Sequence, residues 1–162
     1  MNLLRTRRFV ADSTLGRLAK WLRLMGFDTA FDAKPPDPFR LMALGGGSRL
    51  VLTRSQGVFH QLADGRVLLI RSEQPQKQIR QMILQLHIRR QELRPFTRCA
   101  ACNAVPDYLP KENAVGLVPD YVLGHQQQFY QCPRCRRIYW SGSHCRRWTK
   151  MVDQWYEDLE NG

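Results

Sequence analysis

Four of the five cysteines form two pairs with the same internal spacing, and this feature constrains the fold more than any other. The pairs are Cys99-Ala-Ala-Cys102 and Cys132-Pro-Arg-Cys135. A gap of two residues lets both thiolates of a pair reach one ion, and two such pairs complete the four-thiolate shell of a structural zinc site. The alternative is a pair of disulfides, but the chain shows no secretion signal and cytosolic thiols stay reduced. We therefore expect a closed zinc site with a structural role.

Aromatic and basic residues surround the second cysteine pair. The segments Phe129-Tyr130 and Ile138-Tyr139-Trp140 flank it as the two arms of a predicted hairpin. The tip of this hairpin carries Arg134, Arg136 and Arg137. A ribbon of this composition can stack unpaired bases on its aromatic rings. Strand alternation equally allows Phe129 and Trp140 to pack the small core of the ribbon instead.

The segment 143–162 has the pattern of an amphipathic helix. Its apolar stripe consists of Trp148, Met151, Val152, Trp155 and Leu159. Because such a stripe has to be covered, we expect this helix to dock on the main part of the chain. Ser141 or Ser143 is expected to cap it. The remaining cysteine, Cys145, and its neighbour His144 are expected not to bind zinc, because four better-placed thiolates are available.

The N-terminal half alternates strand-like and helix-like segments. A predicted strand at 9–11 is followed by a helix that Gly26 ends. The apolar face of this helix consists of Leu15, Leu18, Ala19, Leu22 and Met25. Further strands are predicted at 27–31, 50–53 and 67–70, and helices at 35–44, capped by Asp37, and at 76–90. This order predicts an α/β fold in which helices cover a mostly parallel sheet.

Polar residues follow three of these strands. Ligands of open α/β sheets bind beyond the carboxyl ends of the strands. The residues at these positions are Asp12 after the first strand, Asp32 after the second, and Arg54 and Ser55 after the third. Asp12 also suits the cap of the helix that follows it, so its role is open between cap and site residue.

The length of the chain limits the number of domains. At 162 residues it can bury one main core and a small accessory core. We expect a main domain over 1–94, a ribbon over 95–142 and the docking helix over 143–162. No apolar run reaches the length of a membrane span and no signal-peptide core follows the basic N-terminus, so we expect a cytoplasmic protein without membrane contact.

The charge is strongly positive, with 25 Lys and Arg against 14 Asp and Glu and a formal net charge of +11. A positive field of this size favours polyanions, above all nucleic acid, although a basic protein with no such partner is the alternative. The candidate contacts are Arg17, Lys20, Arg23, Arg54, Arg134, Arg136, Arg137, Arg146 and Arg147. The segment Gly-Gly-Gly-Ser at 45–48 precedes a strand rather than a helix, so no nucleotide cofactor is expected. No pattern indicates an oligomeric state.

Several segments together resemble the Mut-seven C-terminal RNase domain family, in which a PIN-like nuclease domain is fused to a zinc ribbon. They are FVADSTLGRLAKWLRLMGFDT, RLVLTRS, CAACN, VPDYV and CPRCRRIYWSGSH, and they span most of the chain. The resemblance implies a PIN-like three-layer α/β/α fold for the main domain. It also implies RNA as the substrate and a metal-dependent endoribonuclease activity.

PIN-like nucleases are similar in gathering carboxylates at the strand ends to hold Mg²⁺ or Mn²⁺, which neutralises the phosphate and activates water. By this resemblance Asp12 is the first acid, and Asp32 or Asp37 provides the second, Asp37 being already explained as a cap. The family pattern expects a further acid directly after Leu-Thr-Arg, where this chain has Ser55. A serine can position water but brings no charge, so metal affinity and activity should fall. Asp64 or Glu73 could compensate, though both also suit solvated surface positions.

Three functions follow as hypotheses. The first is an endoribonuclease with a weakened acidic site, in which Asp12 and Asp32 bind the metal and Ser55 positions water. The second is an RNA-binding protein, associated with tRNA or the ribosome, that has lost catalysis. The third is a zinc-ribbon adaptor for DNA or protein, with the nuclease-like domain as scaffold.

Overall fold

A four-stranded parallel sheet forms the centre of the N-terminal half. In the computed structural model, which describes residues 7–62 and 66–161, the strand order is β2-β1-β3-β4. The strands are β1 (Arg8–Ala11), β2 (Asp28–Phe31), β3 (Leu50–Thr53) and β4 (Val67–Leu69). All three pairings are parallel, so the four carboxyl ends lie at one edge of the sheet. The residues that follow β1, β2 and β3 are thereby brought together.

Helices cover both faces of this sheet, which confirms the predicted α/β/α layering. The helices of this half are α1 (Gly16–Leu24), α2 (Pro38–Gly45), α3 (Gln56–Gln61) and α4 (Pro75–Gln85). Phe9 and Leu52 pack in one buried cluster with apolar residues of α1 and α4. Val10 and Val51 point to the opposite face, where they pack with residues of α2 and α3. The central strands are apolar throughout because both of their faces are buried.

Helix α1 follows a short 3-10 turn, η2 (Ser13–Leu15), and has the predicted apolar face. Leu15, Leu18, Leu22 and Met25 are all fully or almost fully buried. Gly26 ends the helix as predicted, with a φ of +96°. A Cβ at this position would lie 2.3 Å from the carbonyl oxygen of Arg94, so glycine also permits a close approach between two backbones.

Two helix predictions need correction. Helix α4 ends at Gln85 rather than at Arg90, because His87 adopts a left-handed φ of +49° and the chain continues into the turn η3 (Arg90–Glu92). Helix α3, which lies between β3 and β4, was not predicted from the sequence. This helix is short and contains Gly57, so its apolar periodicity is weak. The predicted turn at 63–65 lies outside the described residues.

The ribbon is a three-stranded antiparallel sheet with the order β5-β6-β7. Its elements are β5 (Asp107–Leu109), η4 (Lys111–Ala114), α5 (Asp120–His125), β6 (Phe129–Gln131) and β7 (Ile138–Trp140). The β6–β7 hairpin is confirmed, while β5 was not predicted. Phe129 is fully buried in a small cluster against which Trp140 packs, as expected if these two side chains form the ribbon core.

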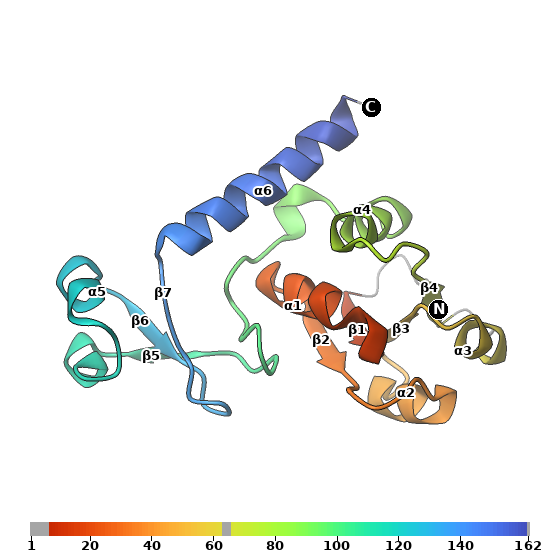
Figure 1. Ribbon diagram of the computed structural model, residues 1–162, viewed down its shortest axis with the longest axis horizontal. Helices are drawn as coiled ribbons and strands as arrows, with labels where there is room; N and C mark the ends of the chain where they lie inside the picture. The colour runs from red at the N-terminus through yellow and green to blue at the C-terminus, as the bar shows by residue number, and fades with distance from the viewer. Residues whose placement is uncertain (1–6, 63–65, 162) are drawn as a thin grey trace.

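Helix α6 (Ser143–Glu160) runs from the ribbon to the helical layer over the parallel sheet (Figure 1). Trp148 and Val152 belong to the same buried cluster as Phe9, so the helix packs on the helical layer of the N-terminal half. Trp155 packs on Trp21 of α1 with ring centroids 5.1 Å apart. Gly142 stands at the N-cap with no side-chain hydrogen bond, so the prediction of a serine cap was wrong. Among the described residues, no helix combines the length and the apolar character that crossing a membrane requires.

Candidate functional site

Asp12 lies at the carboxyl end of β1 and is completely buried. Its Oδ1 accepts hydrogen bonds from the backbone N–H of Thr14 at 2.9 Å and from the Thr14 hydroxyl at 2.5 Å. Its Oδ2 accepts a hydrogen bond from the Thr53 hydroxyl at 2.5 Å. The side chain thus caps η2, one of the two roles left open by the sequence, and both carboxylate oxygens have protein donors.

Asp32 lies next to Asp12 across the strand ends, since its backbone N–H bonds to the carbonyl of Ala11. Its carboxylate accepts hydrogen bonds from the backbone N–H of Lys34 at 3.1 Å and from Nε of Arg40 at 2.5 Å. Burial raises the pKa of this carboxyl group, but the hydrogen bonds from Arg40 and Lys34 outweigh it and lower the pKa below its ordinary value. Asp32 is therefore ionised, and Arg40 already balances its charge.

Asp37 caps α2 through a 2.7 Å hydrogen bond from the backbone N–H of Arg40, as predicted. The three predicted acids therefore have local protein partners. Within residues 7–62 and 66–161, the four ribbon cysteines are the only group of three or more His, Cys, Asp or Glu residues whose ligand atoms could share one ion. The described carboxylates at the strand ends do not form such a group of three.

Ser55 lies two residues beyond the end of β3 and caps α3. Its hydroxyl accepts a hydrogen bond from the backbone N–H of Val58 at 3.3 Å. Its own backbone N–H donates to Oγ1 of Thr53 at 3.0 Å, and that hydroxyl donates to Asp12. Ser55 is thus connected to Asp12 through Thr53, and it stands at the position where the family resemblance led us to expect an acid.

Of the two acids considered as replacements, only Glu73 lies among the described residues. Glu73 pairs with Arg54 at 2.5 Å, and its own side chain is 82% exposed. Asp64 lies outside the described residues. Arg54 is half-buried, and its Nε is buried without a hydrogen-bond partner. The third strand end therefore presents a cation and a hydroxyl.

The four paired cysteines converge on one point in the ribbon. Their sulfurs all lie within 4.8 Å of one another, with Cys99 and Cys135 at 3.5 Å and Cys102 and Cys132 at 3.3 Å. In a tetrahedral shell with Zn–S distances of about 2.3 Å, sulfurs lie about 3.8 Å apart, so these four fit one zinc ion. All are free thiols, which excludes the disulfide alternative.

Each cysteine pair forms the same backbone turn. The residues directly after the second cysteines, Asn103 and Arg136, have left-handed φ values of +73° and +64°, and each donates its N–H to the carbonyl of the first cysteine of its pair. Burial raises the pKa of the Cys99 thiol, but hydrogen bonds led by that of the Tyr139 hydroxyl, at 2.9 Å, lower it to about 6. A thiolate is the form that binds zinc. Cys145 lies apart, with its Sγ near the carbonyl of Trp140 at 3.5 Å.

The first cysteine turn is docked on the edge strand β2. The side chain of Asn103 donates to Oδ1 of Asp28 at 2.6 Å and accepts from the backbone N–H of Thr29 at 2.9 Å. Asp28 also forms a two-pronged pair with Arg49, with N–O distances of 2.7 and 2.9 Å. The ribbon and the parallel sheet are therefore connected by a partly buried polar network, which no local sequence signal indicated.

Arg23 belongs to this connection and not to a nucleic-acid surface, so its predicted role is corrected. It is 6% exposed and donates to the backbone carbonyls of Thr29, Ala100 and Ala101. Burial lowers the pKa of its guanidinium from the ordinary value. The first cysteine turn, 77 residues away in the sequence, covers this position of α1, and its backbone carbonyls accept the hydrogen bonds of the Arg23 side chain.

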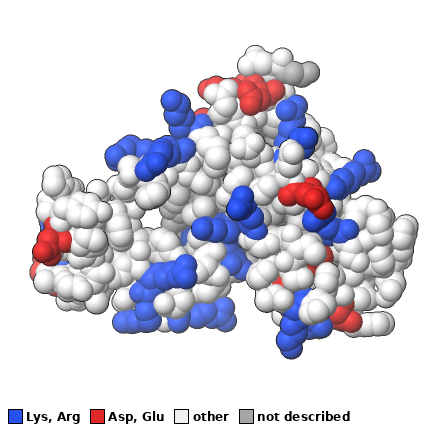
Figure 2. Space-filling view, viewed as in Figure 1, with Lys and Arg blue, Asp and Glu red and all other residues white. Residues whose placement is uncertain are grey.

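The other predicted basic contacts remain accessible. Arg54 is half-buried, and the exposed residues are Arg17, Lys20, Arg134, Arg136, Arg137, Arg146 and Arg147. On the face seen in Figure 2, Lys and Arg side chains gather at the tip of the β6–β7 hairpin and along the first turns of α6. The hairpin tip and the first turns of α6 lie on either side of the junction between the ribbon and the rest of the chain.

A parallel sheet between two helical layers, joined to a four-cysteine ribbon, defines a PIN-like α/β/α protein with a zinc-ribbon module. The model of the Mut7-C RNAse domain family matches residues 7–152, and the chain belongs to this family. The family resemblance inferred from the sequence is thereby confirmed, and the family points to a nuclease-like function related to RNA. Comparisons with curated proteins and with solved structures returned no match.

Proposed function

We propose that the chain binds RNA through its basic surface and that its strand-end site has lost metal-dependent cleavage. The observation that carries this proposal is the set of partners around Asp12. Both of its carboxylate oxygens accept protein hydrogen bonds, Asp32 is balanced by Arg40, and Ser55 replaces the expected acid. A hard dication needs several oxygen ligands, and two or three carboxylates attract it far better than one.

RNA binding is supported by the family and by the charge. The net charge is +11, and exposed arginines lie on the ribbon tip and on α6. Arginine forms two-pronged hydrogen bonds with phosphate and stacks on bases, which suits contacts with RNA. Zinc contributes to this function by holding the ribbon and its arginines in place, through the four cysteines.

A weakened endoribonuclease is the second candidate, and one observation favours it. Asp12 keeps its position at the end of β1, and Ser55 is connected to it through the Thr53 hydroxyl. The frame of the family site is therefore present although an acid is missing. Native protein that cuts RNA with Mn²⁺ and loses this activity in Asp12→Asn would establish this candidate instead.

The binding claim is tested by fluorescence anisotropy with a labelled structured RNA and a DNA duplex of equal length. We expect RNA to bind more tightly, with an affinity that falls steeply between about 50 and 200 mM salt. Replacing Arg134, Arg136 and Arg137 by glutamine should weaken binding and reduce the salt dependence, by roughly one unit of slope per lost phosphate contact. Asp12→Asn should leave the affinity unchanged. Absence of RNA affinity contradicts the proposal, and tighter binding of duplex DNA supports the adaptor hypothesis.

A further inference from the structure

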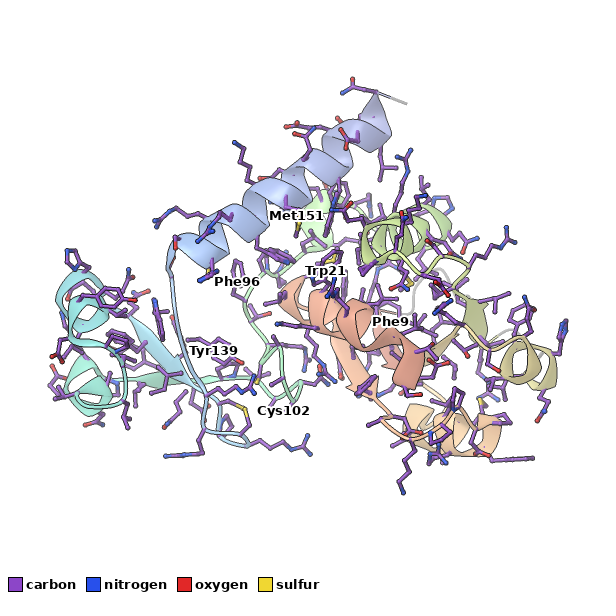
Figure 3. All side chains as sticks on the ribbon, viewed as in Figure 1. Phe9, Trp21, Phe96, Cys102, Tyr139 and Met151 are labelled. Atoms are coloured by element: carbon purple, nitrogen blue, oxygen red, sulfur yellow. The ribbon has the colours of Figure 1, made fainter. Side chains whose placement is uncertain are left out.

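A groove of about 600 Å³ lies between the ribbon and the first half of α6. The hairpin contributes Tyr130 and Tyr139, the segment that leads into the ribbon contributes Phe96, and α6 contributes Arg146 and Lys150. Figure 3 labels Phe96 and Tyr139, which lie on two separate segments below the start of α6. The groove therefore combines aromatic walls with cationic side chains.

One wall of the groove belongs to a row of tyrosines that crosses the ribbon sheet. Tyr108, Tyr130 and Tyr139 are direct neighbours on β5, β6 and β7. Side chains of adjacent positions alternate between faces, and Leu109 and Phe129 point into the ribbon core. The tyrosines therefore occupy the opposite face of the sheet.

Two of these tyrosines are exposed although they are large and mostly apolar. Tyr108 is 62% exposed and Tyr130 is 40% exposed, and their rings meet edge to face with centroids 6.1 Å apart. Tyr139 is anchored at the end of the row by the hydrogen bond between its hydroxyl and Cys99. Because the ribbon core is complete without Tyr108 and Tyr130, their exposed rings are available to a ligand.

The charges around the groove select the kind of ligand. Arg146 and Lys150 are exposed on its α6 side, and the nearby hairpin tip adds exposed arginines. The acidic lining residues, Asp153 and Glu157, lie further along α6, and Asp153 is paired with Arg90 at 2.6 Å. The half of the groove near the start of α6 is therefore positive, which favours a polyanion whose non-phosphate parts are flat and apolar.

We propose that this groove and the tyrosine row bind unpaired nucleotides of RNA. Bases stack on Tyr130 and Tyr108, and the phosphates between them lie against Arg146 and Lys150. Single-stranded nucleic acid is recognised by this combination of aromatic stacking and a positive groove. The inference rests on the proposed RNA-binding function and adds a preference for single-stranded segments.

The test measures the affinity of the full-length zinc-loaded protein for a labelled oligouridylate and for a blunt RNA duplex. Tyr130→Ala should weaken oligouridylate binding about tenfold, as loss of one stacked base does, and should leave duplex binding within about twofold. Tyr130→Phe keeps the ring and should bind like the native protein. Lys150→Ala should also weaken oligouridylate binding. The controls are Tyr121→Ala, whose exposed ring lies on α5, and Lys111→Ala, both outside the groove lining.

Photocrosslinking provides a readout that a purely structural role of Tyr130 would not give. An oligomer containing 4-thiouridine should crosslink to the native protein at the β6–β7 hairpin or at α6, and zinc content is measured for every variant to confirm an intact ribbon. The groove assignment is overturned if Tyr130→Ala and Lys150→Ala bind oligouridylate as tightly as the native protein does. It is also overturned if the crosslinks are confined to other segments. In both cases the proposed RNA binding itself stands. If the native protein binds neither RNA, the proposed function fails and the inference fails with it.

Discussion

The hydroxyl of Thr53 donates a hydrogen bond to the carboxylate of Asp12 and accepts one from the backbone N–H of Ser55. One buried side chain thus connects the end of β1 with the start of α3. The same contact occupies an oxygen of the acid on which a PIN-like metal site would depend. Asp12, Thr53 and Ser55 thus form one hydrogen-bonded network at the ends of β1 and β3.

Thr53→Val should lower the free energy of unfolding by about 1–3 kcal/mol, because Asp12 and the N–H of Ser55 each lose a buried partner while the side-chain shape is kept. The change is measured by urea denaturation. Thr97→Val is the matched control, since its hydroxyl bond to the Arg94 carbonyl is exposed. Its effect should stay within about 0.5 kcal/mol. Equal effects of the two substitutions would contradict the structural role of Thr53.

Arg23→Gln should destabilise the protein by about 2 kcal/mol or more, because the carbonyls of Thr29, Ala100 and Ala101 lose a buried donor. RNA affinity per folded molecule should stay within about twofold of the native value. Lys20→Gln, an exposed change on the same helix, should show the reverse pattern of unchanged stability and weaker RNA binding. A large loss of RNA affinity without destabilisation in Arg23→Gln would restore the original interpretation of Arg23 as a nucleic-acid contact.

Zinc removal should expose the amide of Thr29, whose N–H bonds to the side chain of Asn103. Without the ion the first cysteine turn loses its shape, and Asn103 no longer docks on β2. Amide hydrogen exchange with and without a chelator measures this effect. Exchange at Thr29 should accelerate strongly, while that of Val10, in the centre of the sheet, should change little. Unchanged protection of Thr29 in the metal-free protein would show that the turn does not depend on zinc.

Acid should destabilise the protein partly through Glu92. A hydrogen bond from Arg7, at 2.6 Å, is the main cause that lowers the pKa of this carboxyl group from 4.5 to about 2. A group with a lowered folded pKa stabilises the protein above its unfolded pKa, and this contribution is lost as the pH falls from about 4.5 towards 2. Glu92→Gln should therefore flatten the fall of thermal stability in this window. A curve parallel to that of the native protein would contradict the assignment.

The sequence was most informative where the pattern is local. The cysteine turns follow from a two-residue gap, and the buried face of α1 follows from helical spacing of residues such as Leu18 and Leu22. The family resemblance also led us to expect an acid at position 55, where the sequence has Ser55. The role of Ser55 as the cap of α3 was not predicted, because that helix is short and has no clear periodicity.

What the sequence could not indicate depends on contacts between distant segments. Arg23 looked like a solvent-facing residue of α1 until the first cysteine turn was seen to cover it. The link from Asn103 to Asp28 joins residues 75 positions apart. The tyrosine row needed the register of β5, which was not predicted, to bring Tyr108 beside Tyr130.

Ser55→Asp should keep the cap of α3, because aspartate is an equally good N-cap residue, and it introduces the acid that the family resemblance leads us to expect after Leu-Thr-Arg. Its stability should therefore stay within about 1 kcal/mol of the native value, and any Mn²⁺-dependent cleavage that it gains reports the missing charge. Ser55→Ala, which removes the cap without adding charge, is the matched control and should gain no cleavage.

The central claim is that this member of the Mut7-C RNAse domain family binds RNA without cutting it. The most direct measurement is the cleavage of a total-RNA pool by the native zinc-loaded protein with Mn²⁺, beside Asp12→Asn. The account predicts that the two proteins give identical, uncut RNA at concentrations that saturate binding. Mn²⁺-dependent cuts by the native protein that disappear in Asp12→Asn would contradict it.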